Sequence, residues 1–231
     1  GGVYIEDDVL GIDGTAFTGN TAQTDGGGAY VSGTGLLAGG LFEGNQGIGD
    51  SNGGGIYLMG TLMVTDTEFI SNRVSSNGGG AYVAGDATLT NGLFQANVGT
   101  GNGGGIALFD GSAHVYGTEF IENVSGKKGI GGGLYYSGLN AEGLTVSEAR
   151  FQDNTTGSAG GGAGVLGNAT ISHTTFLGNE AGANGGAFYH SATGDGRIVN
   201  SIFSRNTVAD EGSGDALHLA ADGTVDPIRK I

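Results

Sequence analysis

Hydrophobic and polar residues alternate along the chain in short stretches that recur at a nearly constant spacing. Each stretch ends in a tetrad Phe-x-x-Asn, and the position five residues before the Phe is always aliphatic. The positions two and seven residues before the Phe are apolar or small. A spacing of two places side chains on one face of a strand. No copy contains the roughly 10 to 15 residues of helical period that a crossover helix needs, so about three short strands are predicted per copy.

The tetrad occurs eight times, at successive spacings of 25, 27, 25, 26, 31, 25 and 27 residues. Its members are Phe17 and Asn20, Phe42 and Asn45, Phe69 and Asn72, Phe94 and Asn97, Phe120 and Asn123, Phe151 and Asn154, Phe176 and Asn179, and Phe203 and Asn206. Glycine runs follow seven of the copies and begin at Gly26, Gly53, Gly78, Gly103, Gly131, Gly160 and Gly185. A fixed period of this length is typical of solenoid proteins.

Short strands without helices predict an all-β, single-domain parallel β-helix in which each strand pairs with its counterpart in the next coil. The crossover rule makes it right-handed. We expect eight to nine coils of 25–27 residues over residues 1–220, followed by a non-repeat tail over 221–231. The Phe side chains should stack inside. The Asn side chains should form a ladder at one bend, bonding from coil to coil and tolerating a left-handed backbone, while glycine serves the opposite bend.

These paired signatures, Phe-x-x-Asn and Gly-Gly-x followed by Ile, Leu or Ala, resemble the repeats of chlamydial polymorphic membrane proteins and of the wider group of predicted outer-membrane repeat proteins. The resemblance covers nearly the whole chain, although this sequence prefers Gly-Gly-Gly to Gly-Gly-Ala. It implies a surface-exposed passenger β-helix, typically an adhesin or another cell-surface module, carried by a larger precursor with a membrane anchor.

Composition narrows the classes of function. The 231 residues include 53 Gly, one Pro and no Cys, which excludes collagen and a disulfide framework. The formal net charge is −15, which disfavours nucleic acid and anionic lipid as partners. No stretch approaches the roughly 20 apolar residues that span a bilayer, so we expect no direct membrane insertion. An acidic, glycine-rich rod at the cell surface or in the extracellular space is the expected setting.

One column of the repeat is rich in tyrosine. It lies between the two buried columns that follow each glycine run, so its side chains should point outward. Its tyrosines are Tyr4, Tyr30, Tyr57, Tyr82, Tyr135 and Tyr189. Three interpretations stay open: a plain strand-forming role, a contact with another protein, and stacking on the sugar rings of a glycan.

An enzyme is the main alternative, because many β-helices cleave acidic polysaccharides. Glu68 and Glu119 share an outward column two coils apart, about 9.6 Å, with no adjacent acid or cation to tune them. No catalytic residue is therefore predicted, and a polysaccharide-binding or polysaccharide-cleaving β-helix is the second interpretation.

The sequence offers few candidates for a metal or glycan site. The four histidines fall in different columns, with His114 and His173 expected in solvent, His190 capping the core, and His218 near the end. No cofactor is expected, although the acidic turns at Asp7–Asp8, Asp50, Asp195 and Asp210–Glu211 leave loose Ca²⁺ binding open. Of the glycosylation sequons, those at Asn123 and Asn154 should face inward, which leaves Asn168.

The first residues, 1–5, and the last recognisable strand, residues 215–219, occupy the same position in the repeat, without an amphipathic helix over either end coil. We expect either that neighbouring residues were trimmed away or that end coils of successive copies stack into a head-to-tail filament. The predicted function is a non-catalytic, extracellular structural or adhesive rod. Its expected partners are further copies joined through the terminal coils, or a host or cell-surface protein or glycan.

Overall fold

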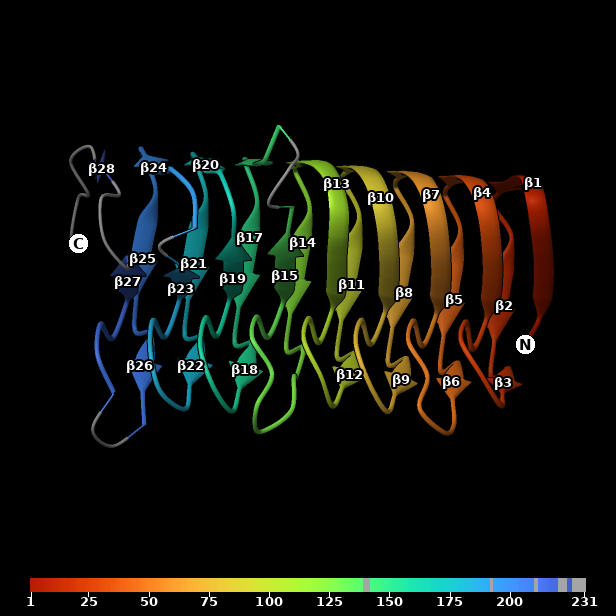
Figure 1. The fold of residues 1–231 in the computed structure, drawn as a ribbon, viewed down its shortest axis with the longest axis horizontal. Helices are drawn as coiled ribbons and strands as arrows, with labels where there is room; N and C mark the ends of the chain where they lie inside the picture. Colours follow the sequence, from red (N-terminus) through yellow and green to blue (C-terminus); the bar gives the residue numbers. More distant parts are fainter. Residues whose placement is uncertain (139–141, 192, 210–211, 220–223, 226–231) are drawn as a thin grey trace.

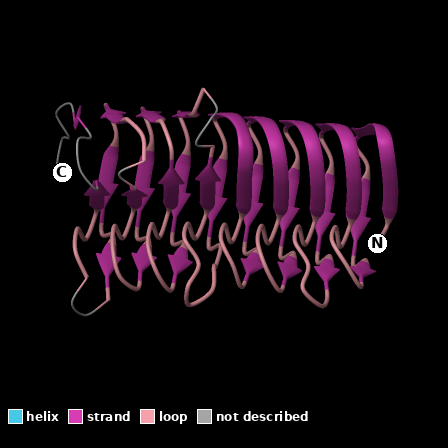
Figure 2. Ribbon diagram, viewed as in Figure 1, coloured by secondary structure: helices cyan, strands magenta, loops and turns pink. Residues whose placement is uncertain are grey.

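The chain winds into a parallel β-solenoid of about eight turns (Figures 1 and 2). The computed structural model describes residues 1–138, 142–191, 193–209, 212–219 and 224–225. Within these ranges every paired strand is parallel to its neighbours and no helix occurs. The all-β parallel fold expected from the repeat is therefore confirmed. The expected division at residue 220 falls in a segment outside the described residues.

The described strands form four sheets, each running along the solenoid. The largest is 13-stranded; its main path contains β1 (Val3–Asp13), β4 (Ala29–Ala38), β7 (Ile56–Thr65), β10 (Ala81–Thr90), β13 (Ile106–Tyr116), β15 (Leu134–Ser137), β19 (Ala163–Leu166), β23 (Phe188–His190) and β27 (Leu217–Leu219). Joined to it are β16 (Leu144–Ser147), β20 (Ala169–Ser172), β24 (Gly196–Val199) and β28 (Thr224–Val225).

The second sheet carries the Phe of each tetrad and contains β2 (Ala16–Thr18), β5 (Leu41–Glu43), β8 (Glu68–Ile70), β11 (Leu93–Gln95), β14 (Glu119–Ile121), β17 (Arg150–Gln152), β21 (Thr175–Leu177) and β25 (Ile202–Ser204). The two smallest follow the Asn: β3 (Thr21–Ala22), β6 (Gln46–Gly47), β9 (Arg73–Val74) and β12 (Val98–Gly99) form one, and β18 (Thr155–Thr156), β22 (Glu180–Ala181) and β26 (Thr207–Val208) the other.

The first five coils depart from the predicted three short strands. In each of them, the strand after the glycine run and the strand before the tetrad are one continuous strand of 10 or 11 residues. In β4, β7 and β10 this strand turns a corner at a glycine with φ between 131° and 139°, a region open to glycine alone. A Cβ on Gly60 would also collide with the carbonyl oxygen of Gly33 in the preceding coil.

Phenylalanines stack through the core from Phe17 to Phe203, as predicted. All seven steps between successive rings are stacked, with centroids 4.6–5.2 Å apart and interplanar angles of 4–13°. The six middle rings are fully buried. Complete burial of one such side chain stabilises the fold by about 2 to 3 kcal/mol. The aliphatic columns around the rings are buried as well.

The asparagines of the tetrad form the predicted ladder. The backbone N–H and the side-chain Nδ2 of Asn72 both donate to Oδ1 of Asn97, each at 3.0 Å. Nδ2 of Asn72 also donates to the carbonyl oxygen of Phe42 at 2.8 Å. One amide thus connects three coils. The expected left-handed backbone lies one residue earlier, however, at Ser71 (φ 55°) and its equivalents. The turn needs this conformation at its exposed position, whereas the Asn must direct its amide inward.

The glycine runs make the opposite bend, as predicted. Their first member has a positive φ in every coil, for example 66° at Gly53. Their second member touches the next coil, because a Cβ on Gly54 would collide with the carbonyl oxygen of Gly79 and with the backbone of Arg73. Side chains are excluded there by backbone atoms, which cannot move aside.

Candidate functional site

The outward tyrosine column is an aromatic strip over the first four coils. The rings of Tyr4 and Tyr30 lie 4.7 Å apart, those of Tyr30 and Tyr57 5.2 Å, and those of Tyr57 and Tyr82 4.9 Å, all stacked within 14° of parallel. The parallel register of β1, β4, β7 and β10 positions them, since these residues are direct Cα partners. Tyr4 is 63% exposed, and the next three are partly buried.

The strip changes character at the fifth coil, where Ala107 takes the tyrosine position. Phe109 fills the gap, with its ring tilted by 30° against Tyr82 and by 53° against Tyr135. Tyr135 lies in the same outward column but is only 5% exposed, so its side chain is covered and not open to solvent. In the seventh coil, a Cβ on Gly164 would collide with the side chain of Ile130, so this apolar side chain lies over the column.

Tyr189 occupies the column in the eighth coil and is partly buried. Its ring stacks on His218 with centroids 5.4 Å apart and an angle of 13°. His218 Nδ1 lies 3.0 Å from the hydroxyl of Ser213. Tyr189 therefore has an aromatic partner of its own, separate from the four-ring strip.

Stacking determines what the strip offers to a ligand. Each inner ring has its two faces against its neighbours, so the ring edges and hydroxyl groups are what remain toward solvent. A sugar ring needs a free aromatic face, and the stacked geometry leaves the inner rings without one. The geometry therefore favours the strand-forming role of Tyr30 and Tyr57 over glycan stacking.

Burial favours the neutral form of three phenols of the strip, those of Tyr30, Tyr57 and Tyr82. Burial, followed by the charges of Asp25 and the neighbouring tyrosines, raises the pKa of Tyr57 to about 12. Burial is also the main cause that raises the pKa of Tyr30 and of Tyr82. At neutral pH Tyr30, Tyr57 and Tyr82 thus form a row of hydroxyl donors on rings that lie 5.2 and 4.9 Å apart.

A second polar ladder, which the sequence reasoning missed, lies beside the strip. It consists of the residue before the glycine run: Asp25, Asn52, Asn77, Asn102 and, in a later coil, Asn184. The backbone N–H of Asn77 donates to Oδ1 of Asn52 at 3.1 Å, and that of Asn102 to Asn77 at 2.8 Å. The sequence signal that could have revealed this ladder is an Asn or Asp directly before five of the seven glycine runs.

This second ladder runs in the opposite direction to the first. In the tetrad ladder the N–H donates toward the next coil, whereas in the second ladder it donates toward the preceding coil. The following glycine N–H is also bonded, for example Gly53 to the carbonyl oxygen of Asn77 at 3.0 Å. The four Asn-Gly pairs of this ladder therefore have both the amide and the glycine N–H in hydrogen bonds.

Glu68 and Glu119 lie in one outward column, with Leu93 between them. The expectation that Glu119 lacks a neighbouring cation is wrong: Arg150 is its partner in the next coil, and their charged groups are 3.6 Å apart. Both side chains are nearly half exposed, so the pair contributes about 1 kcal/mol or less.

The histidines lie apart, as expected. His114 and His173 are exposed. His190 is fully buried in the core, where its Nε2 lies 2.8 Å from the carbonyl oxygen of Gly167 and its Nδ1 has no hydrogen-bond partner. Over the described ranges, no three His, Asp or Glu side chains gather as a metal site.

The acidic turns are separate from one another. Asp7 accepts a hydrogen bond from the hydroxyl of Ser32 at 3.1 Å. Asp8 and Asp50 are exposed, and Asp210–Glu211 lie outside the described residues. Loose Ca²⁺ binding at these turns stays a prediction.

The sequons lie as predicted. Asn123 and Asn154 are fully buried in the tetrad ladder. Asn168 is exposed, and its Oδ1 accepts the backbone N–H of Asp195 at 3.0 Å.

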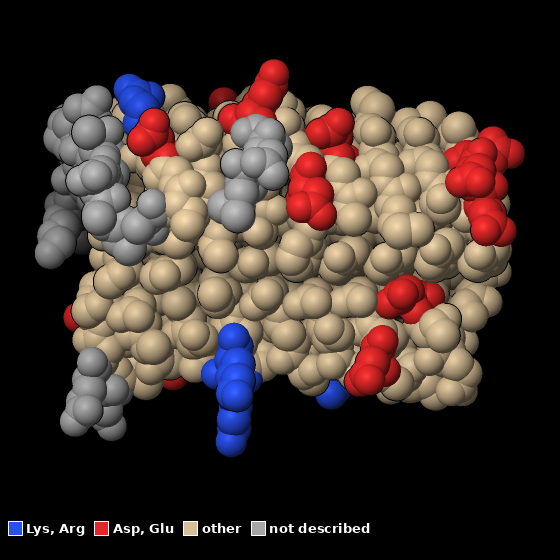
Figure 3. Space-filling view, in the orientation of Figure 1, with Lys and Arg blue, Asp and Glu red and all other residues tan. Residues whose placement is uncertain are grey.

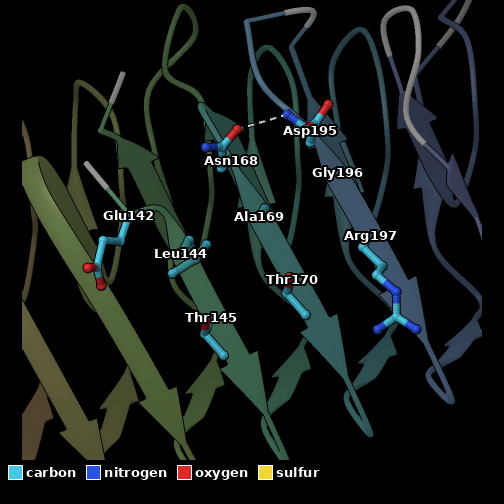
Figure 4. Close-up of a pocket in the computed structure, with 9 residues that line it drawn as sticks. All are labelled: Glu142, Leu144, Thr145, Asn168, Ala169, Thr170, Asp195, Gly196 and Arg197. Atoms are coloured by element: carbon cyan, nitrogen blue, oxygen red, sulfur yellow. Dashed lines mark hydrogen bonds between the residues drawn. The ribbon is translucent and has the colours of Figure 1, made fainter. Parts of the chain in front are cut away.

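A shallow polar pocket surrounds Asn168 (Figure 4). Thr145, Thr170 and Arg197 project in a row from β16, β20 and β24, whose registers align them. Glu142 and Asp195 stand at opposite ends, two coils apart. No aromatic ring is among its described lining residues. The pocket offers hydroxyl, amide and mixed charged groups on an open face.

The comparisons add one match. Residues 173–191 match a protein-family model described as the Chlamydia polymorphic membrane protein (Chlamydia_PMP) repeat. The matched segment holds one tetrad, with Phe176 and Asn179, and one shortened glycine run. This confirms the resemblance expected from the repeats, and together with the solenoid it fits a surface-exposed structural protein. No curated protein and no solved structure matches the chain. Among the described residues, no helix is long and apolar enough to cross a membrane.

Proposed function

We propose that this chain is a non-catalytic, rigid rod at the cell surface or in the extracellular space, with a structural and adhesive role. The observation that carries the proposal is the unbroken stack of the tetrad column: seven consecutive Phe contacts and an Asn ladder over the same eight coils. A solenoid of this kind holds its outward side chains at fixed spacing and presents extended faces to partners.

The distribution of carboxylates supports a non-catalytic role. Hydrolysis of a glycosidic bond needs two carboxyl groups placed across one bond, one of them kept protonated by its surroundings. Glu119 is paired with Arg150 in solvent, and Leu93 separates it from Glu68. Release of reducing ends from any polysaccharide by the purified chain would contradict this role.

The ladders support end-to-end association of copies. At each step of the tetrad ladder the backbone N–H of one Asn donates to Oδ1 of the Asn in the next coil, so the ladder has a direction along the solenoid. A second copy stacked head to tail would continue this direction, whereas head-to-head stacking would place acceptor against acceptor. The partners that we propose for the rod are therefore further copies of the chain and a protein or glycan on the target surface.

Two measurements test the proposal. Small-angle X-ray scattering of the monomer should give a rod about 40 Å long, since eight coils rise about 4.8 Å each; a near-spherical particle would contradict the rod. Sedimentation velocity at rising concentration should show linear association that N20K abolishes and the exposed control N168K leaves intact. Wild-type protein that stays monomeric throughout would contradict the filament while leaving the rod in place.

A further inference from the structure

The outward face of the second half of β1, β4 and β7 contains exposed apolar side chains on adjacent coils. Leu36 and Met63 are direct Cα partners, and Gly11 precedes them in the same column. Leu36 is 42% exposed and Met63 is 48% exposed, and Val9, one outward position before Gly11, is 51% exposed. We call Val9, Leu36 and Met63 with the gap at Gly11 the N-terminal apolar face.

The missing side chain at Gly11 makes this face concave. A Cβ there would touch nothing within 4 Å. A shallow trough of about 360 Å³ runs beside it, and its lining residues include Leu36, Ala38, Met63 and Asp13. Contiguous apolar surface of this kind marks interaction sites on soluble proteins, and the unbranched Met adapts to differently shaped partners.

The charge around this face has a single sign. The first 72 residues contain nine Asp and Glu and no Lys or Arg. Asp13 lines the trough, and Asp66 directly follows Thr65, which lines it too. The first basic residue is Arg73, in β9 of a different sheet. Figure 3 shows acidic side chains gathered over the N-terminal coils at the right.

The acidic charge and the apolar side chains of this face determine which kind of partner can bind it. A second copy placed with the same face inward would bring carboxylate against carboxylate, and an anionic lipid surface would be repelled in the same way. A partner that buries Leu36 and Met63 must bring its own apolar side chains and carry positive charge. We propose that the N-terminal apolar face is a docking surface for a cationic, apolar polypeptide segment of a partner protein. This inference rests on the proposed surface role and names the chemistry of its partner.

The repeat supplies matched substitutions for the test. The column of Leu36 and Met63 continues with Thr88, so L36T/M63T installs the chain's own residue type at outward positions. Ile202, 39% exposed on the second sheet, has Thr175 as its partner in the preceding coil, so I202T is the equivalent control on another face. The probe is a synthetic peptide of alternating leucine and lysine, compared with one of alternating serine and lysine, and binding is measured by isothermal titration calorimetry.

The leucine-lysine peptide should bind the wild type and I202T equally, and L36T/M63T about tenfold more weakly, since two apolar side chains leave the contact. The serine-lysine peptide should bind about tenfold more weakly than the leucine-lysine peptide. Higher salt should weaken the binding of both. The proposal is overturned if L36T/M63T binds like the wild type, if I202T weakens binding as much, or if the leucine-lysine peptide does not bind. Circular dichroism melting of each variant shows whether weaker binding comes from a loss of folding. Small-angle X-ray scattering tests the rod independently, so failure of this docking surface can be distinguished from failure of the proposed function.

Discussion

Replacing Asn97 with alanine removes four side-chain hydrogen bonds from the middle of the buried tetrad ladder. Nδ2 of Asn97 donates to the carbonyl oxygen of Phe69 at 2.8 Å and to Oδ1 of Asn123 at 3.0 Å. Its Oδ1 accepts the backbone N–H and the Nδ2 of Asn72, both at 3.0 Å. Each net hydrogen bond contributes about 1 kcal/mol, and the side chain is fully buried, so water cannot replace it. We expect N97A to lower the free energy of unfolding by about 4 kcal/mol.

The same ladder contains its own control. Asn20, in the first coil, makes one side-chain hydrogen bond, from its Nδ2 to Oδ1 of Asn45 at 2.9 Å, and it is partly exposed. N20A should therefore cost about 1 kcal/mol. Urea unfolding followed by far-UV circular dichroism measures both variants. Because repeats contact only their neighbours, N97A should also lower the m-value as the two halves unfold separately. Equal costs for N97A and N20A would refute the reasoning.

Three further predictions follow from the bends and the strip. In urea denaturation, G54A should lower the free energy of unfolding by more than about 3 kcal/mol, because the added Cβ meets the backbone of Gly79. G11A should change the free energy of unfolding by no more than about 0.5 kcal/mol, because its Cβ meets nothing within 4 Å. Similar values for the two variants would contradict the steric account. Ultraviolet titration should show Tyr57 ionising near pH 12. Because the pKa of Tyr57 is raised in the folded state, the stability that this residue contributes should be complete below about pH 10 and lost between pH 10 and 12. Ionisation of Tyr57 at the ordinary pKa of tyrosine would contradict this prediction. Asn91 should deamidate first among the five Asn-Gly pairs, since it is exposed outside both ladders and its glycine N–H has only a 3.4 Å bond to the Thr118 hydroxyl; peptide mass spectrometry that finds a ladder Asn deamidating faster would contradict it.

The repeated columns were predictable from the sequence because position in the coil determines burial. Every Phe of the tetrad is a direct Cα partner of the next, and every middle Asn of the tetrad is buried, as the alignment required. Periodicity reveals such columns because a solenoid repeats the same surroundings at each coil.

Departures from the repeat were harder to predict. Tyr135 is buried although its column points outward. One coil earlier, Ala107 takes the tyrosine position and the tilted ring of Phe109 fills the gap, an arrangement that depends on contacts between different columns. The pairing of Glu119 with Arg150 was predictable, because the two residues are adjacent members of one outward column. The merging of two strands at Gly33 and Gly60 depends on a backbone angle that the alternation of side chains does not encode.

The central claim is that like residues lie above one another from the first coil to the eighth. The chain has no Cys, so spin labels can be placed at two chosen positions without background. Ala16 and Ile202 occupy the same outward column seven coils apart, and Leu41 and Ile202 six coils apart. Pulsed electron paramagnetic resonance should give about 34 Å for the first pair and about 29 Å for the second, each as a narrow distribution. A distance below about 20 Å for either pair, or no difference between the two, would contradict the stacked solenoid.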